Sequence, residues 1–287
     1  MSIDELENNL DNFITELKDD EIKDSSINVY KTNINEFVKY LKEKNIDSFN
    51  KSDYIKYRDH MKDNKNYEIT TINKYVVVIN KYLKYLNRED LKIKQLRYQR
   101  KQYIENVPSV KDYKRILRAA KKKDEMAYYF IQIAAHTGMR VSAIREITIE
   151  SLKESKHNDD YIKIYSKGKY NEVPLPAWLR RELLKYAKER KITSGYIFPS
   201  PRKKGKPITR KTLWSKVHKM TGQARVDLKK GHPHALRHLL GKEITGALGD
   251  NRVVADIFGH ESRKTSEIYQ QKTKKEISKI MNDFRFK

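Results

Sequence analysis

The sequence predicts a mainly helical protein of two domains with one small β-sheet. Three observations predict it: amphipathic helical patterns before residue 90, a basic aperiodic segment near residue 100, and one alternating strand signal after residue 160. At 287 residues the chain is long for one average domain and comfortable for two. Hydrophobic residues make up 38% of it, which is enough for compact helical cores.

The first domain, residues 1–97, is expected to be a four-helix bundle. Apolar residues recur at helical spacing in the segments 6–17, 30–41, 55–61 and 72–86. Ser25, Ser52 and Thr70 precede the last three patterns, and hydroxyl side chains favour helix starts. Helices with one apolar face each can share a single core.

A basic linker is expected at 98–108, because the stretch KIKQLRYQRKQYIEN (92–106) is basic and aperiodic. It ends at Pro108, next to Ser109, which forms a capping-box pattern with Asp112. The second domain is therefore expected to cover residues 109–287.

The second domain is predicted to be helical with one hairpin. Residues 161–165 and 172–175 flank a turn at Lys167-Gly168-Lys169, which is typical of a β-hairpin. Thr137-Gly138 interrupt a helix, and another short helix follows. Helices are predicted at 110–120, 124–135, 177–190, 209–221 (closed by Gly222), 234–248, 251–258 and about 264–283.

The formal net charge is +24, with Lys and Arg spread along the whole length rather than gathered in one tail. A long polyanion is the natural partner, because each distributed cation releases counterions from DNA or RNA. A general lysine bias of composition is the alternative. No segment has the roughly 18 apolar residues of a spanning helix, so no membrane partner is expected.

The absence of cysteine excludes disulfides, thiolate metal sites and a cysteine nucleophile. A reducing cytosol fits this composition. The acidic start MSIDELENN has neither the basic beginning nor the apolar core of a signal peptide. A cytoplasmic location is therefore expected.

One set of residues in the second domain suits phosphate chemistry. Arginine and lysine neutralise a phosphate whose charge grows in the transition state, histidines move protons, and a tyrosine can be the nucleophile. With 19 tyrosines in the chain, single residues mean little, so order and spacing must carry the hypothesis. The set comprises Arg140, Lys167, His234, Arg237, His260 and Tyr269.

The order and spacing resemble those of the tyrosine recombinase family, which includes the Xer, Cre and integrase proteins. AAHTGMRVSAIREI is similar to the first arginine box, and IYSKGKYNEVPLP to the hairpin with the catalytic lysine. PHALRH resembles the His-x-x-Arg box, and IFGHESRKTSEIYQ resembles the last box. The resemblance covers residues 109–275, and the family also places a helical DNA-clamping domain before its catalytic domain.

The resemblance implies a site-specific recombinase in which Tyr269 attacks a DNA phosphate and forms a 3′-phosphotyrosyl link. The two arginines would hold the non-bridging oxygens, and such planar, permanently charged groups suit that task. Lys167 would protonate the leaving 5′ oxygen, His234 would act as general base, and His260 would hydrogen-bond the phosphate. No nucleotide cofactor is expected, because the covalent intermediate conserves the bond energy, and the resemblance implies that no metal is required either.

Two positions depart from the family pattern or leave a choice. Members often carry an acidic residue three positions after the first arginine, where this chain has Ala143. Glu146, one turn further on, is a candidate substitute. Lys169 is the alternative to Lys167 as the general acid.

DNA recognition is expected on helix 209–221, which the family places in the major groove; an ordinary surface helix is the alternative. Its cations are Arg210, Lys211, Lys216 and Lys219. The implied partners are double-stranded DNA with inverted-repeat core sites and a homotetramer formed through the C-terminal helix. That helix carries an apolar stripe, Ile277, Ile280, Met281 and Phe284, which could instead fold back onto its own domain.

Two other functions remain as alternatives. A type IB topoisomerase uses similar arginine, lysine, histidine and tyrosine chemistry but acts as a monomer without pairing two sites. A DNA-binding regulator could keep the fold without activity, although all six chemical positions are filled in this chain.

Overall fold

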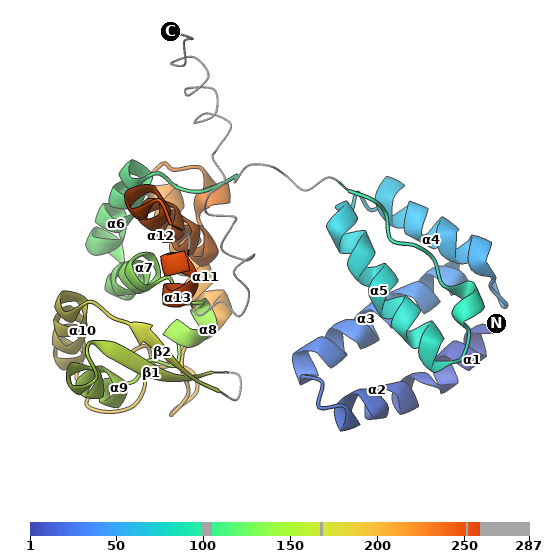
Figure 1. Ribbon diagram of the computed structural model, residues 1–287, viewed down its shortest axis with the longest axis horizontal. Helices are drawn as coiled ribbons and strands as arrows, with labels where there is room; N and C mark the ends of the chain where they lie inside the picture. The colour runs from blue at the N-terminus through green and yellow to red at the C-terminus, as the bar shows by residue number, and fades with distance from the viewer. Residues whose placement is uncertain (99–104, 167–168, 251, 259–287) are drawn as a thin grey trace, which may run out of the picture. The chain divides into compact units, whose positions relative to one another are not determined.

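The computed structural model describes residues 1–98, 105–166, 169–250 and 252–258. It contains two compact units, residues 1–100 and residues 101–287. The described part is mostly helical with a two-stranded antiparallel sheet, which confirms the predicted fold class (Figure 1). Within these residues, no helix is long and apolar enough to cross a membrane.

The first unit is a helical bundle in which α5 (Ile69–Tyr85) contacts both α3 (Asp24–Glu43) and α4 (Lys51–Asp63). Eight residues of α5 are buried, so it forms the centre of the bundle. Large aromatic side chains fill much of the core, and such rings bury more apolar area than aliphatic groups. They include Phe13, Phe37, Phe49, Tyr54, Tyr57 and Tyr82.

The helix predicted over 6–17 is in fact two helices, α1 (Ile3–Asn8) and α2 (Leu10–Asp19). Asn9 lies between them, and its side-chain amide donates to the Glu5 carbonyl at 2.8 Å. Leu6 and Leu10 are both buried across the break. The apolar pattern survives the interruption, which is why periodicity alone predicts one continuous helix.

Two asparagines of α5 bind the chain that leaves the first unit. The Asn80 side chain exchanges two hydrogen bonds with the backbone of Ile93, at 2.8 and 3.2 Å. Asn73 does the same with Leu96, at 2.9 and 2.8 Å. Residues 93–96 have no periodicity in sequence, yet these paired bonds attach them to the first unit.

The second unit is centred on α7 (Glu125–Thr137), which has nine buried residues. The long helices that pack against α7 are α6 (Val110–Lys123), α10 (Ala177–Glu189), α11 (Arg210–Gln223) and α12 (Pro233–Leu248). The shorter helices are α8 (Val141–Ile144), α9 (Ile149–Glu154) and α13 (Arg252–Phe258). The predicted capping box of Ser109 and Asp112 is confirmed, with both bonds near 3 Å.

The predicted hairpin consists of β1 (Tyr161–Ser166) and β2 (Lys169–Pro174). Ser166 pairs with Lys169, so residues 167 and 168 connect the strands. Ile162 and Ile164 are buried, while Tyr165 and Tyr170 pair on the exposed face with ring centroids 5.1 Å apart. β1 contacts α8 and β2 contacts α13, which brings the hairpin beside both short helices.

The prediction that Gly222 closes its helix is wrong. Gly222 lies inside α11, and the chain leaves the helix through Arg225, whose φ is 52°. The Val226 N–H donates to the Thr221 carbonyl at 3.1 Å, which completes the helix end. Arginine therefore occupies the left-handed position that the sequence suggests for glycine.

Candidate active site and nucleic-acid interface

Arg140 follows the tight turn that ends α7. The Thr137 hydroxyl donates to the Ile133 carbonyl at 2.7 Å and accepts from the Met139 N–H at 3.2 Å. Gly138 is left-handed, with φ of 63°, and Arg140 becomes the N-cap of α8. Its side chain is exposed, and no hydrogen bond or ion pair of it is found in the described part of the chain. The guanidinium is open to an anion from solvent.

Arg237 on α12 has the opposite environment, since only 3% of the residue is exposed. Its guanidinium donates to the Gly138 carbonyl, and to the Phe258 carbonyl at 3.2 Å. The Phe258 ring packs against it, with its centroid 4.0 Å from Cζ. A buried cation needs such partners, because an unpaired one is very costly. Arg237 thereby links α12 to the end of α7 and to the end of α13.

Gly138 cannot be replaced by a larger residue without strain. A Cβ atom at this position would lie 2.1 Å from Cε1 of Phe258. The positive φ also disfavours any residue with a side chain. The glycine therefore permits both the turn that leads to Arg140 and the close approach of Phe258.

Three histidines lie near the start of α12. His232 is the N-cap, and its Nδ1 accepts a hydrogen bond from the Ala235 N–H at 3.1 Å. His234 and His238 are one helical turn apart, and their rings meet edge-on with centroids 4.3 Å apart. His238, which the sequence analysis does not single out, is therefore in contact with the predicted general base.

Burial and nearby positive charge keep these imidazoles neutral. Burial lowers the pKa of His234, and the charges of Arg237, His232 and Arg140 lower it further. Burial lowers the pKa of His238 to about 4. A neutral imidazole at pH 7 can accept a proton. The Arg237 guanidinium binds the Gly138 carbonyl, so α12 packs against the turn that leads to Arg140.

The other three predicted catalytic residues, Lys167, His260 and Tyr269, lie outside the described residues. Of the two candidate lysines, Lys169 is the first residue of β2 and pairs with Ser166. Phe258, whose carbonyl Arg237 binds, precedes His260 by two residues.

Glu146 does not substitute for the acidic residue that is absent at Ala143. Within the described ranges, Arg140 forms no ion pair with Glu146. Glu146 lies instead beside Tyr196, where burial first and then this carboxylate raise the pKa of the phenol. The turn at Gly138, rather than a carboxylate, fixes the backbone of Arg140.

The predicted DNA-binding cations on α11 differ in their surroundings. Arg210, Lys211 and Lys219 are exposed. Lys216 instead forms an ion pair with Asp124, whose side chain also caps α7 by accepting from the Ala127 N–H at 3.0 Å. Lys216 therefore ties α11 to α7, which argues against its predicted role in DNA binding.

The two units differ strongly in charge. Residues 1–100 contain 19 Lys and Arg against 18 Asp and Glu, whereas residues 101–287 contain 43 against 20. Residues 190–226 have eleven Lys and Arg and no acidic residue at all. This acid-free segment includes α11 and adds exposed cations just before it, Arg202, Lys203, Lys204 and Lys206. A segment whose charged residues are all positive creates a positive electrostatic potential, which favours a polyanionic ligand.

A family model described as the phage integrase family matches residues 106–276, and the phage integrase N-terminal SAM-like domain matches residues 10–90. The chain belongs to the phage integrase family. This match confirms the resemblance to tyrosine recombinases that the four boxes indicate. The SAM-like match lies within the first unit, and the phage integrase match lies within the second unit.

Curated relatives in the family are named tyrosine recombinases. XerA of Pyrococcus furiosus is 25% identical over 223 residues, which are 76% of this chain and 75% of XerA. XerD of Haemophilus influenzae is 27% identical over 161 residues, which are 54% of this chain and 52% of XerD. The chain thus matches about half the length of this XerD.

Solved structures of integrase-family proteins share the fold. XerH recombinase bound to difH substrate in a pre-cleavage complex aligns with a TM-score of 0.70 at 18% identity, covering 96% of this chain and 84% of XerH. A lambda integrase dimer bound to a COC′ core site also reaches 0.70 at 15% identity, covering 91% and 75%. At such identities the likeness shows the fold alone.

Sequence reasoning missed some residues of the integrase-family site. The acid-free segment 190–226 was visible in the sequence as a charge pattern. His238 had a weaker signal, its spacing of four from His234 on a helix. Phe258 had none, because only the tertiary structure brings its ring onto Arg237 and Gly138.

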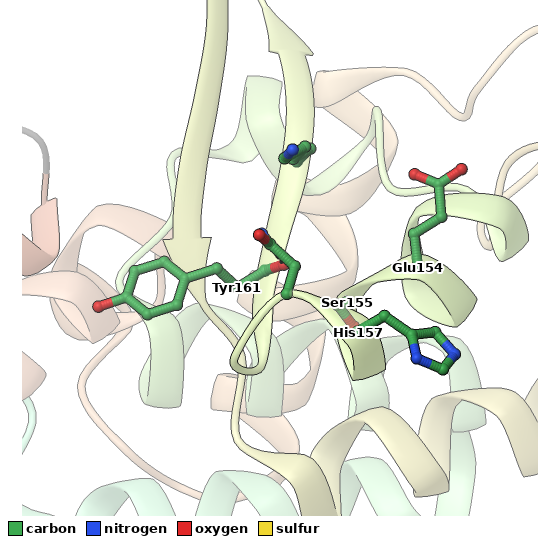
Figure 2. A pocket seen from close by; sticks show the side chains of 6 residues that line it. Glu154, Ser155, His157 and Tyr161 are labelled. Carbon is green, nitrogen blue, oxygen red and sulfur yellow. Dashed lines mark hydrogen bonds between the residues drawn. The ribbon is translucent and has the colours of Figure 1, made fainter.

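A pocket lies at the end of β1 opposite the 167–168 turn. Its lining residues are Glu154, Ser155, His157, Asn158, Tyr161 and Lys163. The side chains of Glu154, His157 and Tyr161 point in different directions rather than toward one point (Figure 2). The pocket includes none of the predicted catalytic residues, so it has no part in the candidate site.

Proposed function

We propose that the chain is a site-specific recombinase that cuts and rejoins double-stranded DNA through Tyr269. The observation that carries the proposal is the position of Arg237, whose guanidinium binds the Gly138 carbonyl two residues before the exposed Arg140, with His234 nearby on the same helix α12. Two fixed positive charges stabilise a phosphate whose negative charge grows in the transition state. A neutral imidazole beside them supplies the base that such a transfer needs.

In the proposed reaction, the Tyr269 oxygen bonds to phosphorus and the bond from phosphorus to the 5′ oxygen breaks. His234 accepts the tyrosine proton, and Lys167 gives a proton to the leaving 5′ oxygen, with Lys169 as the alternative donor. The products are a 3′-phosphotyrosyl link and a free 5′-hydroxyl. A 5′-hydroxyl from another strand reverses the step, so the reaction consumes no cofactor.

The remaining contacts hold the phosphate. Arg140 and Arg237 bind its non-bridging oxygens, and His260 adds a hydrogen bond. Arg140 is open in the described structure, so the phosphate replaces solvent there. Arg237 reaches the phosphate with an orientation that its two carbonyl partners already fix. Such preorganisation avoids reorganisation cost during the reaction.

We further propose that the duplex lies along the exposed face of α11, with Arg210, Lys211 and Lys219 as contacts. The first domain, residues 1–97, would hold the duplex through its own surface, connected by the linker 98–108. Recombination would then require a homotetramer on two inverted-repeat sites, linked through the C-terminal residues 276–287. Deleting those residues should leave single-site binding within a few fold and abolish recombination between two plasmid sites.

The deciding experiment traps the covalent complex. A DNA site is first selected from a random pool by its binding to the protein. Versions of this site are then made with a nick next to each phosphate in turn. Cleavage at such a phosphate releases a short strand, and its loss prevents rejoining. The wild type should give a protease-sensitive protein–DNA band. Tyr269→Phe should bind this DNA as well as the wild type but form no covalent protein–DNA band. The control Tyr170→Phe removes an exposed hydroxyl of the hairpin and should form the band as the wild type does.

Other outcomes identify other functions. A band from Tyr269→Phe rules out Tyr269 as nucleophile. Wild-type protein that binds but never cleaves is a DNA-binding regulator, and one that relaxes plasmids without joining two sites is a topoisomerase. A substrate with a bridging 5′-phosphorothiolate distinguishes Lys167 from Lys169, because its sulfur leaves without a proton. The Ala variant of the lysine that acts as general acid should recover cleavage on this substrate, and the Ala variant of the other lysine should not.

A further inference from the structure

Trp214 is the one large hydrophobic side chain that α11 exposes, with 46% of its surface open. Leu213, Val217 and Met220 face the core, and the indole lies on the flank of the helix, about a quarter turn from this buried side. A single exposed apolar residue is ordinary. An exposed indole is informative here because of what surrounds and supports it.

His218 supports the indole from the next helical turn. The two rings stack with centroids 4.7 Å apart and an angle of 15° between their planes. Nδ1 of His218 is buried and has no hydrogen-bond partner in the parts of the chain that the structure describes. The imidazole thus provides a flat support that limits rotation of the indole. A side chain fixed in this way loses less entropy when it binds a ligand.

The exposed charged residues of the helix that carries the indole are all basic. Arg210, Lys211 and Lys219 are exposed on the same helix, which lies in the acid-free segment 190–226. A duplex offers phosphates to these cations. The indole needs an apolar group on the same ligand, and the base edges of the major groove carry one, the C5 methyl group of thymine.

We infer that Trp214 is a specificity-determining residue that contacts the C5 methyl group of a thymine, with His218 as its support. The inference rests on the proposed function, because it requires α11 to lie in the major groove. Arg210, Lys211 and Lys219 contact phosphates and bind without regard to sequence. Trp214 supplies a preference for thymine at one position of each half-site.

The test removes the methyl group and nothing else. Each thymine of a selected duplex is replaced in turn by deoxyuridine, which keeps every hydrogen-bonding group. Wild-type affinity should fall about fourfold at one position per half-site, the effect of taking one methyl group out of an apolar contact. Trp214→Ala and Trp214→Gln should bind the thymine and deoxyuridine duplexes equally.

Two controls separate this effect from a general loss of binding. Lys211→Ala should weaken binding to both duplexes by the same factor, since a phosphate contact does not sense the methyl group. Trp178→Phe alters the only other tryptophan, 40% exposed on α10, and should keep the full methyl effect. In the Trp178→Phe variant, bound DNA should also reduce the quenching of Trp214 fluorescence by acrylamide.

A wild type that shows no methyl effect at any thymine overturns the inference. So does a full methyl effect in both folded Trp214 variants, or unchanged quenching of Trp214 on DNA. The covalent trap with Tyr269 is independent of these measurements. A protein that forms the adduct without a methyl effect refutes only the role of Trp214, whereas the absence of any adduct refutes the proposed function.

Discussion

Besides burial, Arg140 and Arg237 both lower the pKa of the His234 imidazole, yet the surroundings of the two arginines are opposite. Arg140 is exposed and has no partner among the described residues. Arg237 is 3% exposed, donates to two backbone carbonyls and packs on the Phe258 ring. The comparison teaches that Arg140 forms no structural contacts besides its proposed role at the phosphate, among the described residues, whereas Arg237 also links α12 to the ends of α7 and α13. Substitutions should separate these two roles.

The largest effect is expected for Arg237→Lys. An ammonium group cannot keep the planar contacts to the carbonyls of Gly138 and Phe258 and bind a phosphate as well. Cleavage should fall by about a thousandfold or more, given that one lost transition-state contact costs about 10²–10³. The free energy of unfolding should fall by about 2–4 kcal/mol, because buried carbonyls lose their donors. Single-turnover cleavage and urea denaturation measure the two losses.

Arg140→Lys should lose activity without losing stability. Removal of one planar contact to the phosphate should slow cleavage by about 10²–10³. The free energy of unfolding should stay within about 0.5 kcal/mol of the wild type, as for other exposed positions. A loss of stability equal to that of Arg237→Lys would remove the distinction between the two arginines.

Gly138→Ala tests the contact that joins the two arginine regions. The added Cβ meets the Phe258 ring, and the positive φ strains any side chain. The protein should lose about 2–4 kcal/mol of stability from strain and overpacking together. Combination with Phe258→Ala should cost less than the sum of the two single changes, because the clash is gone. Strictly additive losses would show that the two residues do not meet.

The smallest effects are expected on α11. Lys211→Ala should reduce the slope of log affinity against log salt by about one unit, since it removes one phosphate contact. Lys216→Ala should leave that slope unchanged and lower stability by about 1 kcal/mol or less, through loss of its ion pair with Asp124. Equal changes in slope would return Lys216 to the DNA interface.

Local patterns predicted most of the fold. The capping box of Ser109 and Asp112 was readable because all its partners lie within four residues. The hairpin was readable because alternation and turn residues are also local. The helix break at Asn9 could not be predicted from the sequence, because Leu6 and Leu10 are buried on both sides of it and the apolar periodicity continues across it.

The candidate site was predicted from the order of the sequence motifs. This order assigns the chain to a family, but it does not show which side chains contact one another. The structure shows that Arg237 binds the Gly138 carbonyl, two residues before Arg140. The ion pair of Lys216 with Asp124 spans 92 positions, so no local pattern reveals it. The contact of Phe258 with Gly138 depends likewise on the packing of α13 against the end of α7.

The claim that both arginines serve one phosphate is tested most directly by removing the charge of that phosphate. A methylphosphonate at the cleavage position replaces one non-bridging oxygen by a methyl group and leaves the linkage neutral. If Arg140 only neutralises charge, the cleavage defect of Arg140→Ala should shrink at least tenfold on this substrate relative to the natural phosphate. An equal defect on both substrates would contradict the role of Arg140 at the phosphate.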